Sequence, residues 1–223
     1  MRNESRYKIP PLRAIQFFRR KIILWFRKNK RQYPWRETRD PYRVLMAEVM
    51  LRRTRADQVK PVYEVLFKKY PDAESMANAN GNNLRRILYP LGLRWRVPAF
   101  RKIARAVLQK FGGRVPNSRQ ELTSLPGVGD YVAGAVLSIA FGKKEWMVDS
   151  NIVRVLKRYF GLNTSKEGRR DKHIVKLGRI YSSACNPRDA NLAILDFAAL
   201  ICIPRNPRCP SCPIRNSCSY FNK

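Results

Sequence analysis

Apolar residues recur along this chain at spacings of three and four, the period of an amphipathic helix, and sustained strand-like alternation is absent. The pattern predicts an all-α protein. The predicted helices cover residues 12–28, 41–54, 58–69, 82–88, 97–111, 118–123, 131–141, 150–160, 171–184 and 189–201. Pairs such as Tyr33-Pro34 and Tyr89-Pro90 are expected to lie between helices, and the polar segment 163–170 is expected to be a loop.

The charge of the chain indicates its partner. Lys and Arg number 46 against 16 Asp and Glu, which gives a formal net charge of +30 spread over every segment. Such an excess is typical of proteins that bind nucleic acid, although some proteins are basic for solubility alone. No apolar run approaches the roughly 18 residues of a spanning helix, so we expect no membrane contact.

Four cysteines lie close together near the C-terminus: Cys202, Cys209, Cys212 and Cys218. Their C-x6-C-x2-C-x5-C spacing suits a [4Fe-4S] cluster, in which each iron takes one thiolate, but four cysteines also satisfy tetrahedral Zn²⁺. Disulfides would suit an exported mini-domain, and the charged first residues do not resemble a signal peptide. The spacing alone leaves the metal open. Cys185 stands apart and is expected to be a small core residue.

The segment LPGVGDY, Leu125 to Tyr131, precedes a strongly apolar helix. Gly127 and Gly129 flank Val128, and two glycines allow a tight turn that brings amide groups to the start of the next helix. A helix N-terminus of this kind binds phosphate. Glycines at helix ends are also common as simple C-caps, but the basic charge of the chain favours a DNA-binding hairpin.

Asp149 follows an apolar run and precedes a helix, where aspartate is a favoured N-cap. A carboxylate held there by amide donors and the helix dipole suits a group that opposes developing positive charge or orients a water molecule. One helix separates Asp149 from the hairpin. We therefore expect both to face the same groove.

Glu48 lies on a predicted helix with Val44, Leu45 and Leu51 as its helical neighbours, so its carboxyl group is expected in an apolar stripe. A buried glutamate is costly and invites a functional explanation. If buried, Glu48 could act as a proton donor. The alternative is a salt bridge with Arg52, four residues further along, at the rim of the stripe.

Taken together, LPGVG-x-Y, V-D-S-N-x-x-R-V and the cysteine spacing, between about Trp35 and Cys218, resemble the helix-hairpin-helix DNA glycosylases of the endonuclease III superfamily. The resemblance implies a six-helix barrel lobe, residues 33–145, and a discontinuous lobe, residues 1–32 and 146–223, with double-stranded DNA bound between them. It also implies a [4Fe-4S] cluster rather than zinc on the four cysteines, and it makes Asp149 the catalytic aspartate.

Three positions bear on the subfamily. Tyr131 stands where bifunctional glycosylase/lyases carry a catalytic lysine, so a Schiff base is not available there. Tyrosine is similar to the mismatch-specific thymine-DNA glycosylases, whereas adenine glycosylases usually carry serine. Arg52, Arg53 and Thr54 stand where adenine enzymes typically read Q-Q-T. Adenine glycosylases usually continue into a further domain, which we do not expect here because the sequence stops at Lys223.

The resemblance therefore implies a monofunctional DNA glycosylase that flips thymine or uracil out of a mismatch with guanine and hydrolyses its N-glycosidic bond. The alternatives are an adenine glycosylase acting opposite 8-oxoguanine or guanine, and a DNA-binding module without catalysis. We expect a monomer in a reducing intracellular compartment, the cytoplasm in a prokaryote.

The resemblance also assigns roles. Asp149 would stabilise the positively charged sugar and activate water, and Glu48 would contact the pyrimidine edge. Tyr131 would pack against or hydrogen-bond the extruded nucleotide, or form an aromatic wall without a chemical role. Arg52 and Arg53 would contact the orphan guanine or fill the gap left by the flipped base, although arginines here could equally bind phosphate.

Overall fold

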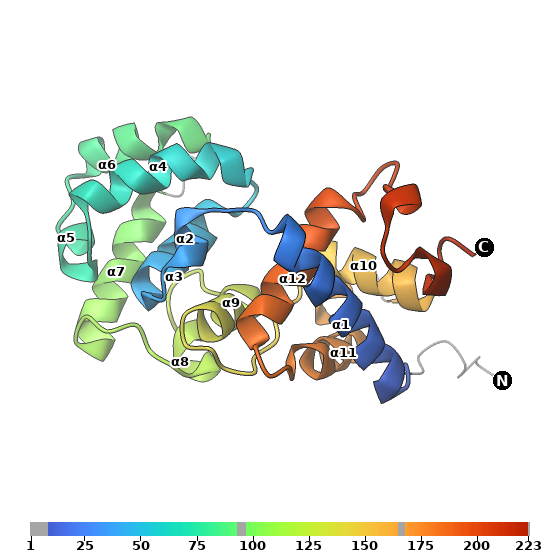
Figure 1. Ribbon diagram of the computed structural model, residues 1–223. Coiled ribbons are helices and arrows are strands. Elements are labelled where there is room, and N and C mark those ends of the chain that lie inside the picture. The colour runs from blue at the N-terminus through green and yellow to red at the C-terminus, as the bar shows by residue number, and fades with distance from the viewer. Residues whose placement is uncertain (1–8, 93–96, 165–167, 223) are drawn as a thin grey trace. The chain divides into compact units, whose positions relative to one another are not determined.

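The computed structural model describes residues 9–92, 97–164 and 168–222, and within them every regular element is a helix. The all-α prediction is therefore confirmed. The chain divides into two compact units, one formed by Met1–Arg31 with Gly142–Lys223 and the other by Gln32–Phe141. We describe each unit by itself (Figure 1).

The unit Gln32–Phe141 is a bundle of short helices. In chain order these are α2 (Pro34–Glu37), α3 (Pro41–Met50), α4 (Ala56–Lys69), α5 (Ala73–Ala77), α6 (Gly81–Leu88), the 3-10 turn η2 (Tyr89–Leu91), α7 (Val97–Phe111), α8 (Arg119–Thr123) and α9 (Asp130–Ile139). Helix α3 packs against α4 and α9, and α5 packs against α7. Trp35 is buried and stacks on Tyr33 with ring centroids 4.8 Å apart.

The other unit joins the N-terminal helix to the C-terminal third of the chain. Its elements are α1 (Leu12–Asn29), α10 (Ser150–Phe160), η4 (Gly168–Arg170), α11 (Lys172–Ser182), α12 (Pro187–Leu200), η5 (Cys209–Ser211) and η6 (Arg215–Ser217). Helix α12 packs against α1 and α10. Asp196 on α12 is fully buried and accepts hydrogen bonds from the backbone N and the Nε of Arg31, at 2.9 and 2.7 Å. These bonds fix the end of the segment that follows α1.

Several boundaries differ from the sequence prediction. Helix α3 ends at Met50 and not at residue 54, because Arg53 has a left-handed backbone with φ of 59° through which a helix does not continue. Pro34 begins a short helix, and Tyr89 begins a 3-10 turn, where both were expected between helices. Within the expected loop 163–170, residues 165–167 lie outside the described residues and Gly168–Arg170 forms a 3-10 turn.

The interpretation of Cys185 as a core residue is wrong, because its side chain is exposed.

No helix among the described residues is long and apolar enough to cross a bilayer.

Candidate active site and DNA-binding hairpin

A tight hairpin connects α8 to α9. Gly127 adopts a left-handed backbone with φ of 73°, a conformation that favours glycine, and Val128 is buried with its amide donating to Leu125 O at 3.1 Å. Gly129 is the N-cap of α9 and has no side chain with which to cap the helix. The start of α9 therefore presents its positive end without a side-chain cap, which suits an external anion.

A carboxylate also lies in the first turn of α9, and the sequence analysis did not single it out. Asp130 has a largely exposed side chain, and Arg119 on α8 donates from Nη1 to Asp130 O at 2.8 Å and to Asp130 Oδ1 at 3.3 Å. The guanidinium offsets a negative charge that would otherwise oppose phosphate at the hairpin.

Glu48 lies on α3, the helix that packs against α9, and its side chain is buried at 5% exposure. The structure thus supports the buried alternative for Glu48. Tyr131 is half-buried in the first turn of α9. Arg52 is exposed, and its Nη1 donates to Gly127 O in the hairpin at 3.2 Å. The α3 end, the hairpin and the start of α9 form one continuous region of this unit.

Asp149 lies in the other unit, where it is the N-cap of α10, as predicted. Its Oδ1 accepts from the backbone N of Ile152 at 2.8 Å, and its Oδ2 accepts from Nδ2 of Asn151 at 2.7 Å. Both carboxylate oxygens therefore have a donor, which fixes the orientation of this half-buried side chain.

Arg154 extends this arrangement toward the cysteines. Its Nη1 donates to Oδ1 of Asn151 at 2.8 Å, its Nε to Cys202 O at 2.9 Å and its Nη2 to Ala198 O at 3.0 Å. Partial burial lowers the pKa of this guanidinium. Asn151 and Arg154 belong to the V-D-S-N-x-x-R-V segment, but the sequence alone gave neither of them a role, although their spacing of three on a predicted helix places them on one face.

The four cysteines Cys202, Cys209, Cys212 and Cys218 line one small cavity whose other walls are mainly apolar, including Val155, Ile201 and Ile214. Burial raises the pKa of the Cys202 thiol and raises that of Cys212 to about 11. The thiolates of Cys202 and Cys212 would therefore need a positively charged partner. Nη1 of Arg158, 3.7 Å from Cys202 Sγ, supplies only part of that charge.

Among the described residues, no three His, Cys, Asp or Glu side chains are arranged to hold a single metal ion. A [4Fe-4S] core binds each thiolate to a different iron, so its ligands need not converge on one point. The donor set, the shared cavity and its apolar walls fit such a core.

Comparison with known proteins identifies the class. The family described as HhH-GPD superfamily base excision DNA repair protein matches residues 46–179, more than half of the chain. The chain belongs to this superfamily, which confirms the resemblance predicted from the sequence motifs.

Individual relatives match this chain over nearly their whole length. The chain is 39% identical over 203 residues to the thymine/uracil-DNA glycosylase of Methanothermobacter thermautotrophicus, covering 91% of this chain and 92% of that protein. It is 36% identical over 218 residues to the thymine-DNA glycosylase of Aeropyrum pernix, covering 93% and 96%. The solved structure of a thermostable thymine-DNA glycosylase matches with a TM-score of 0.87 at 37% identity, over 94% of this chain and 97% of that one.

Proposed function

We propose that this DNA glycosylase removes thymine or uracil mispaired with guanine by flipping the base out of the duplex and hydrolysing its N-glycosidic bond. The observation that carries the proposal is Tyr131 in the first turn of the hairpin helix, together with relatives of nearly equal length that are named as thymine and uracil glycosylases. A phenol cannot form a Schiff base with the sugar, so base release would be hydrolytic and would leave the strand intact.

Asp149 is the proposed centre of the chemistry. Departure of the base gives the sugar oxocarbenium character, and a fixed carboxylate lowers the barrier by opposing that charge and by activating the attacking water. The two donors to Asp149, Ile152 N and Asn151 Nδ2, support this role because they hold the carboxylate before substrate arrives.

Glu48 and Tyr131 would act on the extruded pyrimidine. A glutamate buried on α3 is suited to contact the polar edge of the base and to protonate or polarise it as it leaves. Tyr131, on the helix against which α3 packs, would pack on the nucleotide or hydrogen-bond to it. A mispaired base costs less to unstack, which supplies part of the selectivity.

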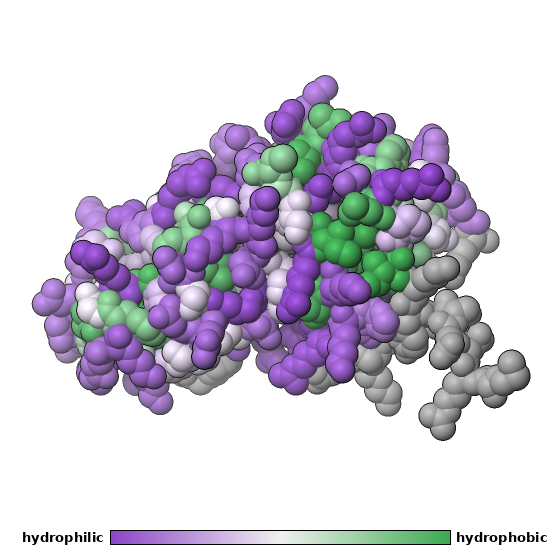
Figure 2. Space-filling view, turned by 90° about the horizontal axis from the view of Figure 1, so that it is seen from below, coloured by the Kyte–Doolittle hydropathy of each residue, from purple (hydrophilic) through white to green (hydrophobic). Residues whose placement is uncertain are grey.

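The hairpin Gly127-Val128-Gly129 would bind the DNA backbone through the start of α9. Arg52 and Arg53 lie close to Glu48 in the sequence. The net charge of +30 supports polyanion binding, and Figure 2 shows hydrophilic side chains over most of one face of the molecule. We expect a mismatched duplex as the partner of a monomeric protein.

Cys202, Cys209, Cys212 and Cys218 would hold a [4Fe-4S] cluster, which is expected to serve as a structural element that orders the basic C-terminal segment. Cysteines that hold such a cluster and do not pair as disulfides would fit a reducing compartment, the cytoplasm in a prokaryote.

The test is base release from duplexes containing G·T, G·U, A·8-oxoguanine or normal pairs, with and without alkali. Thymine or uracil release with strand breaks only after alkali is the expected result. Asp149→Asn should keep duplex affinity within about threefold and lower the rate at least about 100-fold, since it removes the charge from a site where one such group is worth several kcal/mol. Adenine release without pyrimidine release would overturn the substrate assignment, and an unchanged rate in Asp149→Asn would overturn the mechanism.

A further inference from the structure

Two neighbouring arginines occupy the turn between α3 and α4, and their surroundings differ. Arg52 donates from Nη1 to Gly127 O, 75 residues away in sequence. Arg53 is exposed, and its side chain makes no hydrogen bond or ion pair with the residues that the structure describes. The sequence does not distinguish the two cations, whereas their contacts in the structure differ.

We infer that Arg52 is a positioning residue that braces the DNA-binding hairpin against the helix carrying Glu48, while Arg53 is the cation available to DNA. The inference rests on the proposed function. Glu48 lies two residues before the end of α3, and Arg52 lies two residues beyond it. A bond from Arg52 to Gly127 therefore fixes the offset between the phosphate-binding turn and the carboxyl group proposed to contact the base.

The acceptor explains why a guanidinium is suited to this contact. Gly127 has a left-handed backbone, and the next amide, Val128 N, is already bonded to Leu125 O. This bond holds the turn from within, so a further bond from outside to Gly127 O restricts the remaining rotation of the turn. Arg52 Nη1 is also the nearest atom, at 3.8 Å, to the position that a Cβ on Gly127 would occupy.

The contact is solvent-exposed, so it should contribute little to global stability and its effect should lie in geometry. Small displacements of a bound substrate lower rates strongly; a shift of about 1 Å can cost about 100-fold. The brace is therefore expected to influence the rate of the bound complex more than affinity.

Arg53 serves as a matched comparison because it carries the same charge in the same turn. Its left-handed backbone, φ 59°, is a conformation that glycine would adopt without steric cost. A direct contact between Arg53 and phosphate would contribute to the salt dependence of binding, by about one unit of slope.

The experiment compares Arg52→Met with Arg53→Met in the full-length protein, each losing one charge. Amide hydrogen exchange at Val128 is measured without DNA, together with melting temperature, single-turnover base release at saturating protein and the salt dependence of duplex binding. Arg52→Met should speed Val128 exchange about fivefold or more and lower the saturated rate about 10-fold or more at unchanged melting temperature. Arg53→Met should leave Val128 exchange as in the wild type, weaken binding and reduce the salt slope by about one.

Equal Val128 exchange in both variants and the wild type would overturn the brace. A loss of affinity in Arg52→Met with a wild-type saturated rate would also overturn it, by making Arg52 a phosphate contact. If the wild-type protein released neither thymine nor uracil, the proposed function would fail, and the exchange measurement without DNA would still decide the brace.

Discussion

Arg154 donates a 2.8 Å hydrogen bond to Oδ1 of Asn151, whose side-chain amide in turn donates to Asp149 at 2.7 Å. The same guanidinium contacts Cys202 O and Ala198 O. The orientation of the proposed catalytic carboxylate is thereby linked, through two side chains, to the start of the cysteine segment.

Arg154→Met should therefore lower the saturated rate of base release about 10-fold to 100-fold with a smaller change in duplex affinity, because Asn151 loses the contact that orients it. Asn151→Ala should have an effect of similar size. Arg158→Met is the comparison, since Arg158 contacts Ile203 O and Pro204 O of the same segment but not Asn151. A saturated rate in Arg154→Met equal to that of the wild type, on protein of unchanged melting temperature, would rule out the link.

Substitution by serine should distinguish Cys212, a proposed cluster ligand, from Cys185, which is not one. Cys212→Ser is expected to lose iron, inorganic sulfide and brown colour and to melt at a lower temperature, because ligand binding by a cluster contributes directly to folding. Cys185→Ser should retain about four irons per chain, since Cys185 is exposed and does not line the cavity. Iron and sulfide assays on anaerobically purified protein provide the measurement, and full iron content in Cys212→Ser would contradict the proposed ligand set.

Among the residues that the structure describes, the buried hydroxyl of Tyr42 has no hydrogen-bond partner, and burial raises its pKa. Tyr42→Phe should raise the free energy of unfolding by about 1 kcal/mol, because it removes an unsatisfied polar atom without changing the ring. Tyr181 is the control: its buried hydroxyl donates to Ala190 O at 2.8 Å, so Tyr181→Phe should lower the same quantity by about 1 kcal/mol. Urea unfolding of both variants tests the pair, and equal destabilisation would refute the difference.

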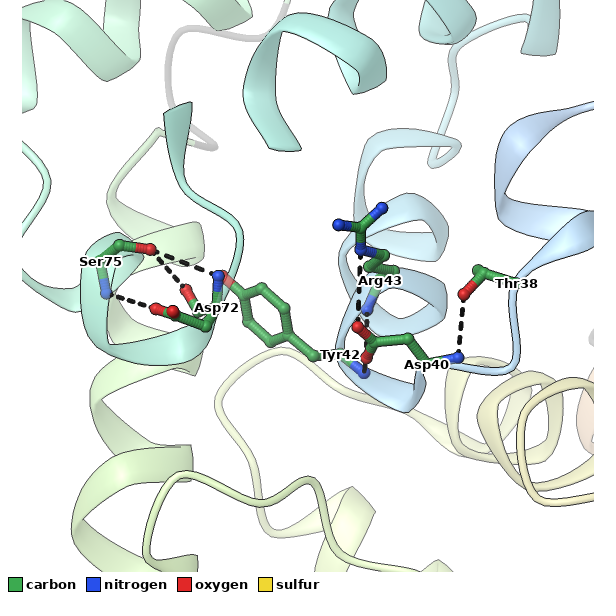
Figure 3. Close-up of polar contacts among 6 residues, drawn as sticks. All are labelled: Thr38, Asp40, Tyr42, Arg43, Asp72 and Ser75. Carbon is green, nitrogen blue, oxygen red and sulfur yellow. Dashed lines mark hydrogen bonds and ion pairs between the residues drawn. The ribbon is translucent and has the colours of Figure 1, made fainter. Parts of the chain in front are cut away.

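Ionisation of Asp72 should make the stability of the protein depend on pH. Asp72 caps α5, and the hydrogen bond that the backbone N of Ser75 donates to its Oδ1 at 2.8 Å holds the pKa of its carboxyl below the ordinary value (Figure 3). A depressed folded-state pKa gives stabilisation that is present above the unfolded pKa, about 3.9, and is lost as pH falls through the folded pKa.

Asp72→Asn should therefore melt below the wild type near pH 7 by a small margin, since asparagine is also a good N-cap, and the margin should close below about pH 4. Melting curves from pH 7 to pH 2 supply the comparison. A margin that stays constant over this range would show that ionisation of Asp72 has no part in it.

Long helices were predictable because their apolar period repeats several times. The predictions for 97–111 and 150–160 match α7 and α10 at both ends. Helices α2 and α5, with four and five residues, were missed, because so few residues give little evidence of a period. The equally short α8 was predicted, as 118–123. The early end of α3 was also missed, because nothing in the composition of the segment marks Arg53 as left-handed.

Parts of the candidate site were equally predictable. Asp149 as an N-cap follows from residue type and position. The apolar helical neighbours of Glu48 favoured its burial, with a salt bridge to Arg52 as the open alternative, and the side chain is buried. The sequence did not indicate the hydrogen-bond partners of Arg52, Arg119 and Arg154, because each of these arginines donates to a backbone carbonyl. Every residue carries such a carbonyl, so no residue type announces it.

The bond between Arg31 and the buried Asp196 spans 165 residues, whereas Gln32–Phe141 is continuous along the chain. On the ribosome, the continuous unit can be complete while Arg31 still waits for its acceptor to be synthesised. The unit that holds Asp149 and the cysteines therefore closes after the continuous unit, and its α1 must remain without its partner α12 until Pro187–Leu200 has been synthesised.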